Sequence, residues 1–155
     1  MDVDKPAPEI YVDADACPVK DEVVRVADRH CLAVHFVSNA RMRLPTGIDV
    51  RRVIVPEGPD VADDWIAEHI SSRDVAITSD IPLAERCLSV GAQVIGSTGK
   101  PFTPDNIGMG LAMRELSRDL REMGEISGGG PSFSKKDRSR FLEALELAVR
   151  RALES

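Results

Sequence analysis

The sequence predicts an α/β protein with a mostly parallel five-stranded sheet and two C-terminal helices. Between residues 9 and 100, short apolar segments alternate with segments of helical periodicity. This alternation is typical of βαβ units, in which helices connect parallel strands by right-handed crossovers. A chain of 155 residues with 43% hydrophobic side chains can bury one core. We therefore expect one domain over residues 1–155, with an α/β core at 9–100 and helices from 103–155 packed on it.

The expected strands are short and rich in β-branched residues. Their ranges are 9–13, 33–38, 50–55, 74–78 and 93–95. Helices are expected from Pro18 onward, over 59–70 and over 82–90, where Gly91 provides a left-handed C-terminal cap. The first helix buries Val19, Val23, Val26 and Ala27 by its spacing, and the second buries Val61, Trp65, Ile66 and Ile70. Residues 39–49 link the second and third strands without a helix, and either a hairpin or an irregular crossover fits.

The pattern changes after residue 100. Thr103 and Pro104 form an N-cap and a first-turn proline. The next helix has an apolar face and ends at Gly124; a glycine hinge at 128–131 follows. Ser134 and Asp137 form a capping box for a last helix. The apolar face of the first of these helices comprises Met109, Met113, Leu116, Leu120 and Met123, and that of the last Phe141, Leu142, Leu145, Val149 and Ala152.

Composition excludes several classes of protein. The net charge is −6 and the pI is about 5.1, which argues against binding of nucleic acid through bulk positive charge. Aromatic residues make up only 4%, so an extended base-stacking platform is not expected. We find no signal-peptide pattern and no apolar run of membrane-spanning length. The three cysteines are far apart and suit reduced thiols. We expect a cytoplasmic protein without a membrane partner.

Acidic side chains follow three of the predicted strands. Asp13 and Asp15 end the first strand, Asp60 and Asp63 open the helix after the third, and Asp80 follows the fourth. Ligands bind beyond the carboxyl ends of strands in an open parallel sheet. Each of Asp15, Asp60 and Asp80 could instead be a helix N-cap. Capping needs only one residue per helix, however, and gathered carboxylates repel one another unless a cation is present. Hard oxygen ligands of this kind suit Mg²⁺ or Mn²⁺.

Several motifs resemble the bacterial YaiI/YqxD family over residues 9–145. The most specific is the string Asp-Ala-Asp-Ala-Cys-Pro at residues 13–18. The others are Gly58-x-Asp60-x-Ala62-Asp63-x-x-Ile66, Val75-Ala-Ile-Thr78-Ser-Asp80-Ile-Pro82-Leu-Ala84, Gly91-Ala, Phe102-Thr-Pro104, Met113-Arg114, Gly129-Gly130-Pro131 and Asp137 with Phe141.

That family is similar in turn to PIN-like nucleases, which cleave RNA, or DNA in some branches, with Mg²⁺ or Mn²⁺. This resemblance implies a PIN-like three-layer α/β/α fold. It also implies an acidic site whose residues match the PIN-like acids at Asp13, Asp60 or Asp63, and Asp80, with Thr78 or Ser79 as a nearby hydroxyl. A fourth acid, frequent in PIN domains, has no counterpart at 93–99, which bears on whether two metals bind.

The leading interpretation is a metal-dependent phosphodiesterase, most simply a ribonuclease. The catalytic set is Asp13, Asp15, Asp60, Asp63 and Asp80, and the metal ligands are Asp13, Asp60, Asp63 and Asp80. Water activated by the metal would attack phosphorus. The substrate would contact Thr78, Ser79, Arg43, Lys100 and Arg114.

Three other interpretations stay open. Asp13 and Asp15 could act as nucleophile and acid/base in an Asp-dependent phosphatase. Thr78 and Lys100 could belong to a phosphoreceiver-like switch. A nucleic-acid-binding module without turnover also fits the missing fourth acid. Binding of nucleic acid, with RNA favoured, should be weak and metal-dependent, and the sequence leaves open whether the chain forms a homodimer.

Overall fold

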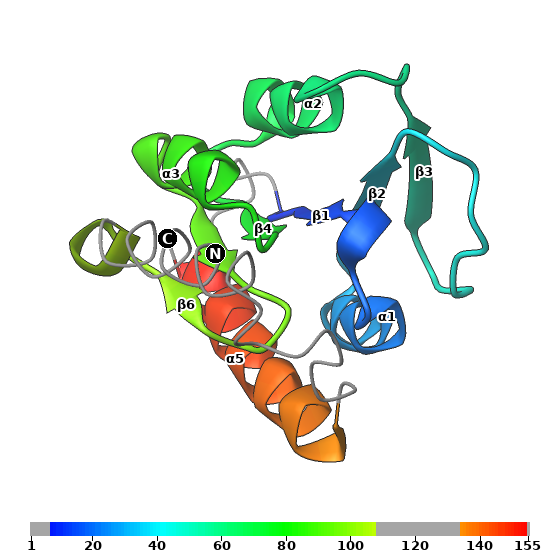
Figure 1. Ribbon diagram of the computed structural model, residues 1–155. Coiled ribbons are helices and arrows are strands. Elements are labelled where there is room, and N and C mark those ends of the chain that lie inside the picture. Colours follow the sequence, from blue (N-terminus) through cyan, green and yellow to red (C-terminus); the bar gives the residue numbers. More distant parts are fainter. Residues whose placement is uncertain (1–6, 108–133, 155) are drawn as a thin grey trace, which may run out of the picture.

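A six-stranded sheet forms the centre of the computed structural model, which describes residues 7–107 and 134–154 (Figure 1). The strand order is β3-β2-β1-β4-β5-β6. All neighbouring strands are parallel except β5 and β6, which are antiparallel. The strands are β1 (Ile10–Asp13), β2 (Val34–Ser38), β3 (Val50–Ile54), β4 (Val75–Ile77), β5 (Gln93–Ile95) and β6 (Pro101–Phe102).

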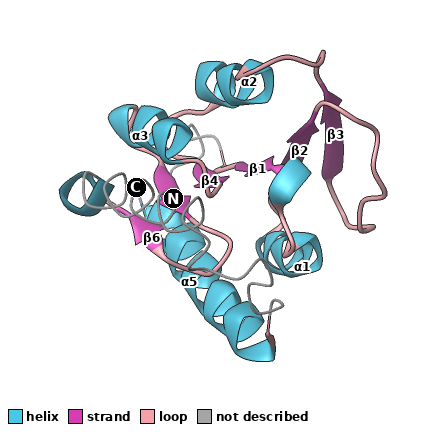
Figure 2. Ribbon diagram, in the orientation of Figure 1, coloured by secondary structure: helices cyan, strands magenta, loops and turns pink. Residues whose placement is uncertain are grey.

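Helices cover both faces of the sheet. Helices α1 and α5 lie on one face, and α2 and α3 lie on the other (Figure 2). A single 3-10 turn, η1, follows β1 directly. The bounds are η1 (Ala14–Ala16), α1 (Lys20–His30), α2 (Val61–His69), α3 (Ile81–Ser89) and α5 (Lys135–Glu154). In the described residues, no helix is both long and apolar enough to cross a membrane.

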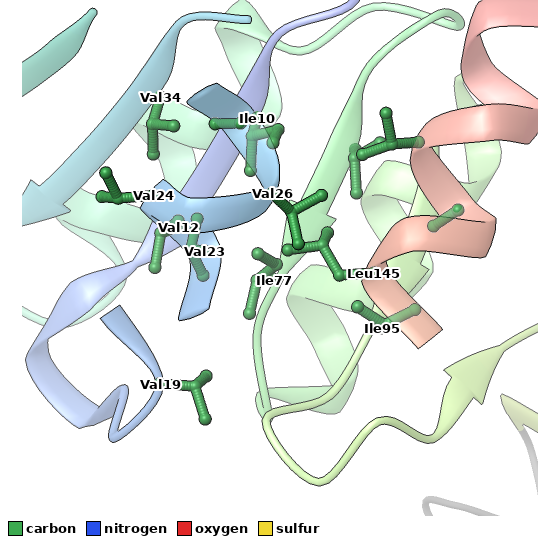
Figure 3. Packing of buried hydrophobic residues seen from close by; sticks show 14 of the residues in the cluster. Ile10, Val12, Val19, Val23, Val24, Val26, Val34, Ile77, Ile95 and Leu145 are labelled. Carbon is green, nitrogen blue, oxygen red and sulfur yellow. The ribbon is translucent and has the colours of Figure 1, made fainter. Parts of the chain in front are cut away.

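The alternation of side chains along each strand divides the core into two layers. In β1, Ile10 and Val12 face α1 and α5, whereas Tyr11 faces α2 and α3. Figure 3 shows the first layer, in which Val23 and Val26 of α1 and Leu145 of α5 pack with sheet residues. All five residues of β2 are buried, including the polar His35 and Ser38, because helices cover both faces of the sheet at this strand.

The structure confirms an α/β fold with a mostly parallel sheet, and it differs from the expected five strands at the C-terminal edge. The extra strand, β6, has only two residues, which is too short for a sequence pattern to reveal. The link between β2 and β3 is an irregular crossover, because Val34 pairs in parallel with Val50. Met42 and Leu44 of this link pack against the core and take the place of a crossover helix.

Several local signals act as predicted. Ser134 and Asp137 form the capping box: Asp137 N donates to Ser134 Oγ at 3.1 Å, and Ser134 N donates to Asp137 Oδ2 at 3.1 Å. Thr103 Oγ1 accepts a hydrogen bond from Asn106 N at 3.2 Å, where residues 104–107 are helical. Gly91 has φ +93° after α3. The predicted apolar helix with Met109 and Met123, its end at Gly124 and the glycine hinge lie outside the described residues.

Two helices differ from the expectation: α1 begins later, and α2 buries fewer of its apolar side chains. Helix α1 begins at Lys20, with Val19 and not Pro18 before it. The predicted buried side of α1 is confirmed. In α2, Ile66 is buried, whereas Val61 and Trp65 are only half-buried.

Candidate functional site

The strand order creates one crevice at the carboxyl ends of β1 and β4. From β1 the chain passes through α1 to β2 on one side, and from β3 it returns through α2 to β4 on the other side. The two connections diverge at this switch point, and ligands bind to open α/β sheets at such points. Asp13 is the last residue of β1, and Thr78 to Asp80 follow β4 directly.

A cavity of about 240 Å³ lies at this crevice. Its walls come from three strand ends, because Asp13 ends β1, Thr78 to Asp80 follow β4, and Ser97 follows β5. The complete lining is Asp13, Cys17, Ile77, Thr78, Ser79, Asp80 and Ser97. Two aspartates and three hydroxyl groups therefore share one small space.

Thr78 connects the two aspartates. Its buried hydroxyl donates to Asp13 Oδ2 at 3.2 Å and accepts from the backbone N–H of Asp80 at 3.0 Å. A hydroxyl can donate one hydrogen bond and accept others, so this arrangement satisfies the buried group. Thr78 thus orients the Asp13 carboxylate and holds the backbone from which Asp80 extends.

Asp80 has two functions at its position. Its Oδ1 accepts a hydrogen bond from Leu83 N at 3.0 Å, so it is the N-cap of α3, and it also lines the cavity. The cap interpretation is correct for this residue. The cap also fixes the direction of the carboxylate, because Oδ1 is held by the first turn of the helix.

The carboxylates interact electrostatically. Burial raises the pKa of Asp13 above its ordinary value; the hydrogen bond from Thr78 opposes this, and the charges of Asp80 and Asp15 add to it. The pKa of Asp63 rises to about 6, first because of burial and then because of Asp80, Asp13 and Asp60. Repulsion between nearby like charges favours the neutral acid. Asp63 therefore belongs to the same cluster as the two cavity aspartates.

Asp15 and Asp60 lie at the periphery of this cluster. Asp15 is exposed in η1 and accepts a hydrogen bond from Asn39 N at 3.3 Å. Asp60 is exposed at the N-cap position of α2, with φ +65° and no side-chain capping bond. Neither residue is a side-chain cap, so the cap interpretation is wrong for both. Neither lines the cavity, whose described lining contains only Asp13 and Asp80 as acids.

The basic residues expected near the acids line other hollows. Arg43 lines a hollow beside Lys20 at the start of α1. Lys100 lines a groove between the end of β5 and α5. Arg114 lies outside the described residues. Direct contact of Arg43 or Lys100 with a group bound between Asp13 and Asp80 is therefore not supported.

Sequence reasoning missed Ser97 as a site residue. Ser97 Oγ lies 3.3 Å from Ser79 Oγ, and both line the cavity. The sequence could have indicated Ser97 through its position two residues after β5, at the same sheet edge as the acids. Cys17 also lines the cavity, but burial raises the pKa of its thiol, which disfavours the reactive thiolate.

The donors fit a hard divalent cation by their chemistry but are not closed around one. Aspartate and hydroxyl oxygens are the ligands that Mg²⁺ and Mn²⁺ prefer. Among residues 7–107 and 134–154, however, no three or more His, Cys, Asp and Glu side chains are grouped so that they could hold a metal ion. The cluster is a set of crowded carboxylates around a polar cavity.

The fold and cavity define an α/β protein with an acidic cavity at the switch point of its sheet. The family described as "Uncharacterized BCR, YaiI/YqxD family" matches residues 11–151. The chain belongs to this family, as its motifs predict.

Relatives cover nearly the whole chain. A "UPF0178 protein" of Parvibaculum lavamentivorans is 65% identical over 142 residues, which are 91% of this chain and 93% of the relative. A UPF0178 protein of Rhodospirillum rubrum is 62% identical over 142 residues, 91% of this chain and 95% of the relative. One of Mesorhizobium japonicum is 55% identical over 150 residues, 97% of both chains. No solved structure matches this chain.

Proposed function

We propose that this protein is a metal-dependent phosphodiesterase, of the PIN-like ribonuclease type, that binds Mg²⁺ or Mn²⁺ at its aspartate cluster. The proposal rests on the meeting of Asp13 and Asp80 in one cavity, linked through Thr78. The position of the acids after the first and fourth strands, on a sheet of order β3-β2-β1-β4-β5, also supports a PIN-like fold.

The raised pKa of Asp63 supports a site that functions with a cation. A carboxyl group with a pKa of about 6 is partly protonated near neutral pH, because burial disfavours its ionised form and Asp80, Asp13 and Asp60 repel it. A bound cation reverses this repulsion and favours ionisation. The proposal therefore includes release of a proton and a small approach of Asp63 toward the cavity on metal binding.

Each residue of the proposed site then has a distinct function. Asp13, Asp80 and Asp63 would hold the metal, with Asp60 near enough to add charge. Thr78 orients Asp13, and Ser79 and Ser97 offer hydrogen bonds to phosphate oxygens. When bound, Mg²⁺ or Mn²⁺ supplies activation of water and neutralisation of charge at phosphorus. Asp15, at the periphery, adds negative charge without a direct contact.

Thermal unfolding with increasing Mn²⁺ or Mg²⁺ tests the metal site. A ligand that binds only the folded state stabilises it by about 2.7 kcal/mol at a concentration 100-fold above its Kd. We expect this stabilisation for the wild type and its loss in Asp13→Asn and Asp80→Asn. Asparagine is as good an N-cap as aspartate, so Asp80→Asn should remove the ligand while α3 stays intact.

Asp64→Asn is the matched control. Asp64 lies next to Asp63 on α2, but it is exposed and forms an ion pair with Arg86 at 2.6 Å. This variant should keep the metal response. If neither metal stabilises the wild type, the proposal of a metal site is wrong.

Cleavage of single-stranded RNA with each metal tests the chemistry. We expect cleavage by the wild type and by Asp64→Asn, and none by Asp13→Asn or Asp80→Asn. Metal-dependent binding of RNA without cleavage would contradict the enzyme and favour the non-catalytic binding module.

A further inference from the structure

A second hollow lies beside the carboxylate cavity and differs from it in chemistry. This groove has a volume of about 590 Å³ and lies between β5, the turn that leads to β6, and α5. Phe102 and Leu147 supply apolar surface, and Leu147 is 49% exposed although it is a large hydrophobic residue. Three basic side chains and one acid also line it: Lys100, Arg140, Arg151 and Glu143.

The two hollows share one wall, the turn at residues 96–100. Ser97 lines the carboxylate cavity, whereas Gly99 and Lys100 line the groove. Two hydrogen bonds close the turn: Gly99 N donates to the carbonyl of Gly96 at 3.0 Å, and Gly96 N donates to the carbonyl of Lys100 at 2.9 Å. A ligand that occupied both hollows would therefore cross only this short turn.

The turn is held in place on both sides. On the cavity side, Ser97 Oγ lies 3.3 Å from Ser79 Oγ. On the groove side, Gly99 has φ +87°, and a Cβ at this position would lie 2.8 Å from the carbonyl oxygen of Arg140. Only glycine permits so close an approach of the turn to α5. The groove is thus a preformed feature, because its two walls contact each other through backbone atoms.

The charge of the groove is opposite to that of the cavity. Three bases and one acid line the groove of a protein whose net charge is −6. Basic side chains around an apolar surface complement a ligand that combines a phosphate with a flat, weakly polar ring. A nucleotide has this composition. Long basic side chains also keep their charge at the rim while their methylene groups cover apolar surface.

We propose that this groove binds a nucleotide of the polynucleotide substrate, next to the nucleotide whose phosphate enters the carboxylate cavity. Lys100 and Arg140 contact its phosphate, with Arg151 adding charge, and the base lies against Phe102 and Leu147. The inference rests on the proposed function and identifies the substrate as a polynucleotide that spans both hollows. It also accounts for how an acidic protein retains a phosphate-rich substrate.

Binding of a fluorescein-labelled single-stranded RNA oligonucleotide to the full-length chain, followed by anisotropy with Mn²⁺ present, tests this inference. The wild-type chain is the reference, and the oligonucleotide has a phosphorothioate backbone that slows cleavage, so that the cavity acids need not be changed. Lys100→Gln with Arg140→Gln should raise the Kd about tenfold. The slope of log K against log salt concentration should also become shallower by about 0.7, as expected for the loss of one neutralised phosphate on a single strand.

Two further variants separate charge from apolar contact. Leu147→Ala removes exposed apolar surface and should weaken binding about threefold with an unchanged Tm. Arg25→Gln is the matched control, because Arg25 is exposed on α1 and is not among the residues lining the groove. Equal binding by the groove variants and Arg25→Gln would overturn the inference. A labelled mononucleotide in place of the oligonucleotide should bind far more weakly, since it cannot occupy both hollows; equal binding would overturn the spanning substrate.

A second copy of this chain is the competing occupant of the groove. Sedimentation that shows a dimer, disrupted by Leu147→Asp while RNA binding is unchanged, would overturn the inference. Failure of the proposed function is distinguishable: if the groove variants weaken RNA binding but the wild type never cleaves RNA, the groove assignment stands and the phosphodiesterase does not. If the wild type cleaves RNA and the groove variants bind it normally, the phosphodiesterase stands and the groove assignment does not.

Discussion

Asp63→Asn should stabilise the fold at pH 8 without metal, although it removes a native side chain. The folded state raises the pKa of Asp63 from 3.8 to about 6, so its ionised form costs stability. A shift of about two units would correspond to about 3 kcal/mol if the group were fully shielded from water. Asp63 is only half-buried, and solvent screening reduces this energy. We expect a gain of about 1 kcal/mol.

The pH dependence follows from the sign of the shift. Because the folded pKa is raised, the wild type binds a proton more readily when folded, and its stability relative to Asp63→Asn recovers as the pH falls from above 6 toward 4. Below the unfolded pKa of about 3.8 the carboxyl is protonated in both states, so the difference disappears. Urea unfolding in EDTA at several pH values between 4 and 8 measures this trend.

Asp64→Asn provides the comparison. Its carboxylate is exposed and paired with Arg86, so its loss should cost between 0 and about 1 kcal/mol and should not stabilise the fold at pH 8. If Asp63→Asn is no more stable than the wild type at pH 8, the carboxylates are not crowded as reasoned. With Mn²⁺ present the order should reverse, because the wild type then gains the ligand that Asp63→Asn lacks.

Substitutions at three positions test the local structure by thermal or urea unfolding. Asp80→Ala should cost about 1 kcal/mol through loss of the α3 cap, whereas Asp80→Asn should cost little; equal losses would show that the hydrogen bond to Leu83 is not what matters. Gly99→Ala should cost about 1–3 kcal/mol, because it places a Cβ against the backbone of Arg140 at positive φ; an unchanged Tm would refute this close contact. Ser134→Ala should cost about 1 kcal/mol by removing the acceptor for Asp137 N, and Ser134→Thr should restore most of it.

Much of the fold could be predicted because its signals are local. The apolar runs that became β1, β2 and β4 are buried on both faces, so their composition alone indicates a strand. The capping box at Ser134 and the left-handed Gly91 also depend on neighbouring residues only. By contrast, β6 has two residues, and its pairing with β5 depends on where the chain has already been placed.

The candidate site divides in the same way. The sequence showed that aspartates follow the ends of several strands, and five were expected to converge. Asp13 and Asp80 meet because β1 and β4 are neighbours, and that adjacency follows from the crossovers. Asp15 lies in η1, the turn that follows β1 directly, and accepts a hydrogen bond from Asn39 N instead of lining the cavity. The Asp-Ala-Asp pattern does not reveal this turn.

The sequence by itself determined the class of fold, the position of most helices and strands, and the presence of acids at one sheet edge. These follow from hydrophobic periodicity and turn chemistry, which act over a few residues. Only the tertiary structure decided which acids share a cavity, which basic residues stand apart from it, and that Ser97 joins it. Side-chain proximity across 65 residues of chain, as between Asp13 and Thr78, depends on strand order, and strand order is set by the packing of the whole core.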